Sequence, residues 1–130
     1  MKMKKQAGQA LITLIFFTVI ATTITTAAVS VLFTNTLSTA TAEVGLKAYY
    51  AAESGAEEGF LRLLRHPAYG STETFNQTFE VGEGQAKVTI ENGNIISVGS
   101  ILNGSVVRKV EVQTQLNNGA FTVTSWKEID

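Results

Sequence analysis

The chain has 130 residues, a net charge of −1 and no cysteine, and its single histidine and single aspartate are His66 and Asp130. This composition excludes a disulfide framework, a thiolate metal site, a two-histidine zinc site and a Ser-His-Asp triad within one chain. We therefore expect no enzymatic activity, no metal and no cofactor. The length allows one membrane segment and one small domain, because a domain of roughly 60 residues or more can sustain its own core.

The longest uncharged stretch runs from residue 6 to residue 42, between Lys5 and Glu43. It has 37 residues, whereas an α-helix needs roughly 20 apolar residues to cross the hydrocarbon core of a bilayer. Six threonines and Ser30 between residues 10 and 33 can bond to the carbonyl one turn earlier or contact a neighbouring helix. The sequence predicts a membrane-spanning helix over residues 9–34, and a plain one-helix anchor stays open.

Three lysines, Lys2, Lys4 and Lys5, precede the apolar stretch. The positive-inside rule places them in the cytoplasm and the chain beyond about residue 34 outside. A basic tip before an apolar stretch is also typical of an export signal, and residues 40–42 offer a small-x-small cleavage pattern that would start a secreted domain near Glu43. The apolar part is longer than the roughly 7 to 15 residues of a conventional signal peptide. This length favours a chain that keeps its apolar segment.

A glycine, Gly8, lies between the basic tip and the apolar stretch, in the segment KKQAGQALITLI. This arrangement resembles the class III leader of type IV pilins and the related pseudopilins. The resemblance implies residues 1–8 as a leader, cleavage by a prepilin peptidase between Gly8 and Gln9, and methylation of the new N-terminus. It also implies that residues 9–34 are kept and become the core helix of a filament.

Two positions depart from the pattern of that family. Its members commonly begin, after cleavage, with an aromatic or apolar residue and have glutamate at the fifth position, which is assigned to pairing with a neighbour's N-terminal amine. Here Gln9 and Thr13 occupy those positions. Without that carboxylate the chain resembles certain minor pilins and pseudopilins more than a main shaft subunit.

An amphipathic pattern over residues 35–66 continues the helix, and Pro67 is expected to end it near His66. Small residues on one face would let a sheet approach closely. We expect this face to pack on the sheet through Ala52, Gly55, Ala56, Gly59, Phe60 and Leu63. A second apolar edge, with neighbouring subunits or the same sheet as its two possible partners, contains Leu46, Tyr50, Leu61 and Leu64.

The segment YYAAESGAE at residues 49–57 is similar to the AAE-containing helix of PilX-like minor pilins. Together with the leader and the apolar half, the resemblance covers residues 4–66 in the expected order. Gly45 is an expected point of bending or local melting, since an interior glycine costs about 1 kcal/mol relative to alanine. Glu58 and Arg62 are spaced for an i,i+4 ion pair.

Beyond Pro67 the period changes to two, which predicts half-buried strands in a head formed by residues 67–130. Turn signals occur at residues 82–84 and at the pairs Asn92-Gly93, Asn103-Gly104 and Asn118-Gly119. Five antiparallel strands joined in order are expected at 75–81, 86–90, 95–101, 106–116 and 121–126. One long helix packed on such a meander of four or five strands is an α+β fold, consistent with the type IV pilin-like fold.

Two residues of the predicted strands have specific expected positions. Arg108 falls on the same side of its strand as Val110 and must reach the edge of the sheet. Trp126 is expected to fill the core from the last strand. Without the three N-terminal lysines the chain has 7 basic and 11 acidic groups, so direct binding of nucleic acid is not expected.

The resemblance implies a structural subunit, most similar to a minor pilin, of a type IV pilus or a related type II secretion-like filament. Its location would be the cell membrane as a single-pass protein with the head outside, and then an extracellular or periplasmic filament. Expected partners are other pilin subunits in a homo- or heteropolymer, the prepilin peptidase, the pilus assembly platform, and membrane lipid before assembly. Adhesion, movement, DNA uptake and secretion stay open as uses of the filament. The alternative is a monomeric single-pass membrane-anchored β-domain that binds an envelope partner.

Overall fold

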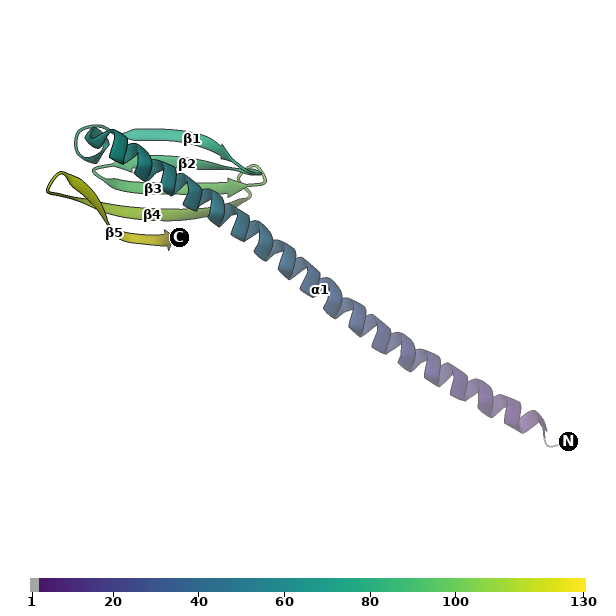
Figure 1. The fold of residues 1–130 in the computed structure, drawn as a ribbon. Helices are drawn as coiled ribbons and strands as arrows, with labels where there is room; N and C mark the ends of the chain where they lie inside the picture. The colour runs from purple at the N-terminus through teal and green to yellow at the C-terminus, as the bar shows by residue number, and fades with distance from the viewer. Residues whose placement is uncertain (1–2) are drawn as a thin grey trace. The chain divides into compact units, whose positions relative to one another are not determined.

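The computed structural model describes residues 3–130, with side chains described from Gly8 onward. Its elements are one long helix, a short 3₁₀ helix and five strands (Figure 1). The bounds are α1 (Met3–Arg65), η1 (Pro67–Gly70), β1 (Phe75–Val81), β2 (Gly84–Glu91), β3 (Asn94–Ile101), β4 (Val106–Asn117) and β5 (Ala120–Ile129). The fold is α+β, as the change of period predicts. The chain forms two compact units, Met1–Ala40 and Thr41–Asp130. We refer to the second unit, which includes the last part of α1, as the head.

The first unit contains the apolar part of α1. Its hydroxyl groups bond within the helix: Thr18 Oγ1 donates to the Leu14 carbonyl at 2.7 Å, and Ser30 Oγ to the Thr26 carbonyl at 3.0 Å. The same i to i−4 bond is made by Thr13, Thr22, Thr23, Thr25 and Thr26. The hydroxyls are therefore satisfied without water, as a helix in an apolar environment requires.

Helix α1 ends where Pro67 forces the backbone to change direction. Its last residue is Arg65, and His66 has φ −133° and ψ 82°, outside the α-helical region that a residue before proline avoids. The single turn of η1 follows, and the backbone N–H groups of Ser71 and Thr72 donate to the Ala68 carbonyl. The sequence predicts the end of the helix but not this extra turn.

The five strands form one antiparallel sheet in the order β1-β2-β3-β4-β5, so the predicted meander is confirmed. Two-residue turns join β2 to β3 and β4 to β5. In these turns Asn92 and Gly93 have φ angles of 51° and 77°, and Asn118 and Gly119 have 50° and 84°. Positive φ at both central residues is the reason for Asn-Gly at these positions. Asn103 lies in a longer turn between β3 and β4.

The core of the second unit lies between the last part of α1 and one face of the sheet (Figure 1). Its fully buried members are Ala52, Ala56, Leu63, Val88, Ile90, Ile95, Val110 and Val112. Gly99 of β3 allows the closest approach: a Cβ atom there would lie 2.1 Å from the Ala48 carbonyl oxygen and 2.3 Å from the Ala52 nitrogen. The helix backbone therefore lies directly on β3.

Gly45 does not interrupt the helix, so the prediction of local melting there is wrong. The residue is buried, and a Cβ atom on it would lie 3.5 Å from Nη2 of Arg108. Arg108 in turn pairs through Nη1 with Glu128 Oε1 at 3.0 Å, with half of its side chain exposed. The guanidinium of Arg108 reaches the edge strand of the sheet, as expected. It also lies next to Gly45 and shields the helix backbone there from water.

Candidate functional site

The most unusual surface is the apolar helix, by which we mean residues 9–34 of α1. By length and composition, α1 between Gly8 and Arg65 contains a segment able to cross a membrane. Leu11, Phe16 and Phe33 are 58%, 64% and 65% exposed, and no side chain between Gly8 and Ala40 is buried within the described chain. A contiguous exposed apolar surface of this size requires lipid or protein to cover it.

The residues around the expected leader junction are exposed. Nothing lies within 4 Å of the position that a Cβ atom on Gly8 would occupy, and Gln9 is exposed next to it. Thr13, at the position of the family glutamate, donates its Oγ1 proton to the Gln9 carbonyl at 2.9 Å. Lys2 lies outside the described residues, and the side chains of Lys4 and Lys5 lie outside the described side chains.

The small residues expected to pack on the sheet lie at the helix–sheet contact. Ala52, Gly55, Ala56, Gly59 and Leu63 are buried, while Phe60 is half-buried against the core. A Cβ atom on Gly59 would lie 2.8 Å from Ile95 Cγ2 and 2.9 Å from Val88 Cγ1. These residues hold the helix on the sheet.

A second edge of α1 is exposed within the Thr41–Asp130 unit. Leu46, Tyr50, Leu61 and Leu64 are 50%, 56%, 45% and 46% exposed, and we refer to these four as the exposed helix edge. The sequence left two possible covers for this edge, the sheet of the same chain or neighbouring subunits. The exposed fractions exclude full cover by the sheet.

Strand β5 adds an apolar surface that the sequence did not predict. Trp126 pairs with the fully buried Val112 in the β4–β5 register, yet Trp126 is 38% exposed, so its expected role as a core residue is wrong. β5 is one of the two edge strands of the sheet, and of its apolar residues Phe121 packs against the core while Val123 and Trp126 are exposed. We define the β5 ledge as Val123 and Trp126 of β5 together with Leu116 near the end of β4, which are all exposed.

Tyr49 of α1 is half-buried and packs against the core of the second unit. Its pKa is raised, first by burial and then by the carboxylates of Glu53 on the helix and Glu128 on β5. Tyr49 also contacts Tyr50 of the exposed helix edge, with ring centroids 5.9 Å apart. We treat the exposed helix edge and the β5 ledge as two separate apolar surfaces.

Arg62 lies in an aromatic cluster on the β1 side of the helix. Its guanidinium carbon lies 4.9 Å from the ring centroid of Phe75 and 5.0 Å from that of Phe79, and Nε donates to Glu58 Oε1 at 2.8 Å. The predicted Glu58–Arg62 pair is confirmed. Because the charge is neutralised and the rings are occupied, this cluster stabilises the head and leaves little for a ligand to bind.

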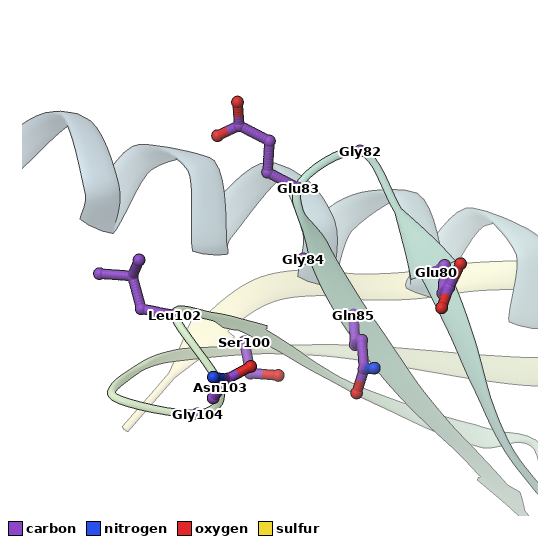
Figure 2. A pocket seen from close by; sticks show the side chains of 9 residues that line it. All are labelled: Glu80, Gly82, Glu83, Gly84, Gln85, Ser100, Leu102, Asn103 and Gly104. Carbon is purple, nitrogen blue, oxygen red and sulfur yellow. The ribbon is translucent and has the colours of Figure 1, made fainter.

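A hollow of about 690 Å³ lies between the β1–β2 and β3–β4 turns (Figure 2). Glu83 points from the first turn towards α1, where Lys47 Nζ donates to its Oε2 at 2.9 Å. Within the described part of the chain, no group of three or more His, Cys, Asp or Glu side chains could hold a metal ion. The hollow is the space between two turns, lined by Glu80, Gly82, Glu83, Gly84, Gln85, Ser100, Leu102, Asn103 and Gly104.

The protein has an α+β fold, and among its described residues one helix is long and apolar enough to cross a membrane. Neither a protein-family model, nor a curated protein, nor a solved structure matches the chain. The apolar helix and the order of the motifs along the sequence are therefore the features that point to a function.

Proposed function

We propose that this chain is a structural subunit of a type IV pilus or a related filament, similar to a minor pilin, and that it assembles through the apolar helix. One observation carries the proposal: an uncharged segment with exposed apolar side chains belongs to the same α-helix that packs on the sheet of a folded head. A cleavable signal would not need that continuity. A filament subunit needs it, since the head must stay attached to the helix that assembles.

The energetics of the apolar helix support exchange between lipid and protein. Thirteen Leu, Ile, Val or Phe residues between 10 and 33, at about 0.3 to 0.6 kcal/mol each, favour insertion by roughly 4 to 8 kcal/mol before polar penalties. Helices of sister subunits offer a similarly apolar environment. Threonine hydroxyls and small residues add close contacts between such helices without an exposed charge.

The leader supplies the proposed control of assembly. While Lys2, Lys4 and Lys5 are present, they hold the N-terminus at the cytoplasmic surface. Cleavage by a prepilin peptidase between Gly8 and Gln9 would remove all three charges. The helix could then leave the bilayer sideways and enter a filament, with the assembly platform and other pilin subunits as partners.

The head supplies a second proposed contact between subunits. The exposed helix edge (Leu46, Tyr50, Leu61 and Leu64) and the β5 ledge expose apolar side chains that the head itself leaves uncovered. Neighbouring subunits would cover these side chains when the heads come together. Thr13 has no carboxylate to pair with a neighbour's N-terminal amine, which favours a minor over a main shaft subunit.

The mass of the N-terminus of protein purified from the cell envelope tests the proposal. A chain that starts at Gln9, with or without a methyl group, is the expected result. A chain that retains Lys2, Lys4 and Lys5 would favour the monomeric membrane anchor instead. A chain that starts near Glu43 would favour a secreted domain, and either of these two results would contradict the filament proposal.

A further inference from the structure

Three Asn-Gly pairs form turns of the head, and the proposed filament function uses none of them. Asn92, Asn103 and Asn118 have φ angles of 51°, 56° and 50°. Asparagine before glycine is prone to spontaneous deamidation, because glycine has no Cβ to shield its backbone nitrogen. We infer that Asn118 is a site of spontaneous deamidation in the folded protein, and that the fold makes it react faster than Asn103 and much faster than Asn92.

The reaction needs only the protein and water. The backbone nitrogen of the glycine attacks Cγ of the asparagine, the N–Cγ bond forms, and the Cγ–Nδ2 bond breaks. The glycine N–H proton goes to the departing nitrogen, which leaves as ammonia, and a five-membered succinimide remains. Water then opens the ring at either carbonyl and gives aspartate or isoaspartate. One water is consumed, one ammonia is released, and a neutral amide becomes a carboxylate.

The attack needs backbone rotation at the asparagine, so that Cγ comes within bonding distance of the next nitrogen. This rotation breaks the turn. The rate in the folded protein is therefore governed by the free energy of opening that turn locally, which varies across a structure with the number of buried contacts that opening disrupts.

The turn at Asn92 is held closed by contacts with the core. Gly93 is buried, and its carbonyl accepts a hydrogen bond from Thr114 Oγ1 at 2.6 Å. The nearby strand residues Ile90 and Ile95, which pair with each other across the hairpin, are fully buried. Opening this turn would break the Thr114 hydrogen bond and disturb the core, so Asn92 should react slowest.

The free energy of opening the turn at Asn103 should lie between those of the other two turns. Both Asn103 and Gly104 are exposed, and nothing lies within 4 Å of the position of a Cβ atom on Gly104. However, the attacking nitrogen of Gly104 donates a hydrogen bond to the Ile101 carbonyl at 3.2 Å. Ile101 is itself buried, so freeing that nitrogen loosens the end of a core strand.

The turn at Asn118 opens with the least disturbance. Asn118, Gly119, Asn117 and Ala120 are all exposed, and nothing lies within 4 Å of the position of a Cβ atom on Gly119. The nearest side-chain bond, from Asn117 Nδ2 to Thr122 Oγ1, is long at 3.4 Å and exposed. The residues from Leu116 to Ala120 are exposed, and the first core contact is that of the half-buried Phe121, so opening this turn disturbs less of the core than opening the other two.

Ageing of the full chain in detergent, followed by peptide mapping with mass spectrometry, tests the inference. Aspartate and isoaspartate are quantified at the three sites over time at neutral pH, for the folded protein and for the protein in urea. In the folded protein we expect Asn118 to convert several-fold faster than Asn92, with Asn103 between them. In urea the three rates should converge. Equal rates in the folded protein, or the same order of rates in urea, would overturn the inference.

The variant Thr114→Val isolates the contact that protects Asn92. It removes the hydroxyl that bonds to the Gly93 carbonyl and keeps the size of the side chain. Deamidation at Asn92 should become several-fold faster, while the rate at Asn118 stays the same. If the Asn92 rate did not change in a variant whose Trp126 fluorescence is that of the wild type, the protective role of Thr114 would be wrong.

Discussion

Gly55 of α1 faces Ser97 of β3 so closely that a Cβ atom on Gly55 would lie 2.3 Å from the Ser97 Oγ. The same atom would lie 2.7 Å from Ala86 Cβ. Ser97 is fully buried, and its hydroxyl has no hydrogen-bond partner among the described residues. The absence of a side chain at residue 55 therefore sets how closely the helix approaches the sheet.

This relationship predicts opposite effects for two glycine-to-alanine changes in the same helix. Gly55→Ala should destabilise the head by about 1–3 kcal/mol, because the added methyl group overpacks a rigid core. Gly45→Ala meets only the Arg108 side chain, at an ordinary 3.5 Å, and should stabilise by about 0.5–1 kcal/mol through helix propensity. Urea unfolding of the full chain in detergent, followed by the fluorescence of Trp126, measures both. Equal effects for the two variants would contradict the packing.

Arg62 provides a second prediction, because its guanidinium lies over two aromatic rings as well as beside Glu58. Arg62→Lys keeps the positive charge but loses the flat surface that contacts Phe75 and Phe79. The head should lose about 0.5–1 kcal/mol of stability. The control Arg65→Lys changes the same group on an exposed residue one turn later and should have no measurable effect. Equal unfolding curves for the Arg62 variant and the wild type would show that the stacking contributes nothing.

The ion pair between Lys47 and Glu83 predicts a pH dependence. The hydrogen bond and charge of Lys47 lower the pKa of Glu83 from its ordinary 4.5, and those of Glu83 raise the pKa of Lys47 from 10.5. The stability from Glu83 is present above pH 4.5 and is lost as the pH falls through the lowered pKa. The stability from Lys47 is present below pH 10.5 and is lost as the pH rises through the raised pKa.

An NMR titration of the Glu83 carboxylate tests this pair directly. The variant Lys47→Met should return the pKa of Glu83 towards 4.5. The control Lys87→Met removes an exposed lysine on the other face of the sheet and should leave that pKa lowered. Because both partners are solvent-exposed, we expect a clear shift in the titration and only a slight change in the unfolding curve.

The secondary structure was largely predictable from the sequence, because the spacing of apolar residues indicates both the type of element and the side of it that is buried. The bounds of β1, β3 and β4 agree with the alternating patterns to within one residue. The Asn-Gly pairs marked the hairpin turns because few other residues adopt positive φ. Strand β5 extends to Ile129, three residues beyond its predicted end, because the residues after Trp126 continue to pair with β4.

Other features depend on where the helix crosses the sheet, which no local pattern records. Gly99 reads as a weak point in a strand until the helix backbone is found lying on it. The alternating pattern of its strand places Trp126 on the core side of the sheet. The pattern predicts the side on which a residue lies, but not how much of that side the helix covers. The same limit applied to Leu46 and Leu64 of the exposed helix edge, which the sequence alone could not assign to the sheet or to solvent.

If the apolar helix becomes the buried contact between subunits, a single charge placed within it should prevent assembly. Ala21→Lys adds roughly 3 kcal/mol to the free energy of burial near the middle of the helix. The control Thr78→Lys adds the same charge on an exposed residue of β1.

The decisive measurement is the amount of each variant in filaments sheared from cells, relative to its amount in the cell envelope. We expect the Thr78→Lys variant to enter filaments like the wild type and the Ala21→Lys variant to stay out of them, while its head stays folded. Normal incorporation of the Ala21→Lys variant, or the absence of the wild-type chain from every filament, would contradict assembly through the apolar helix.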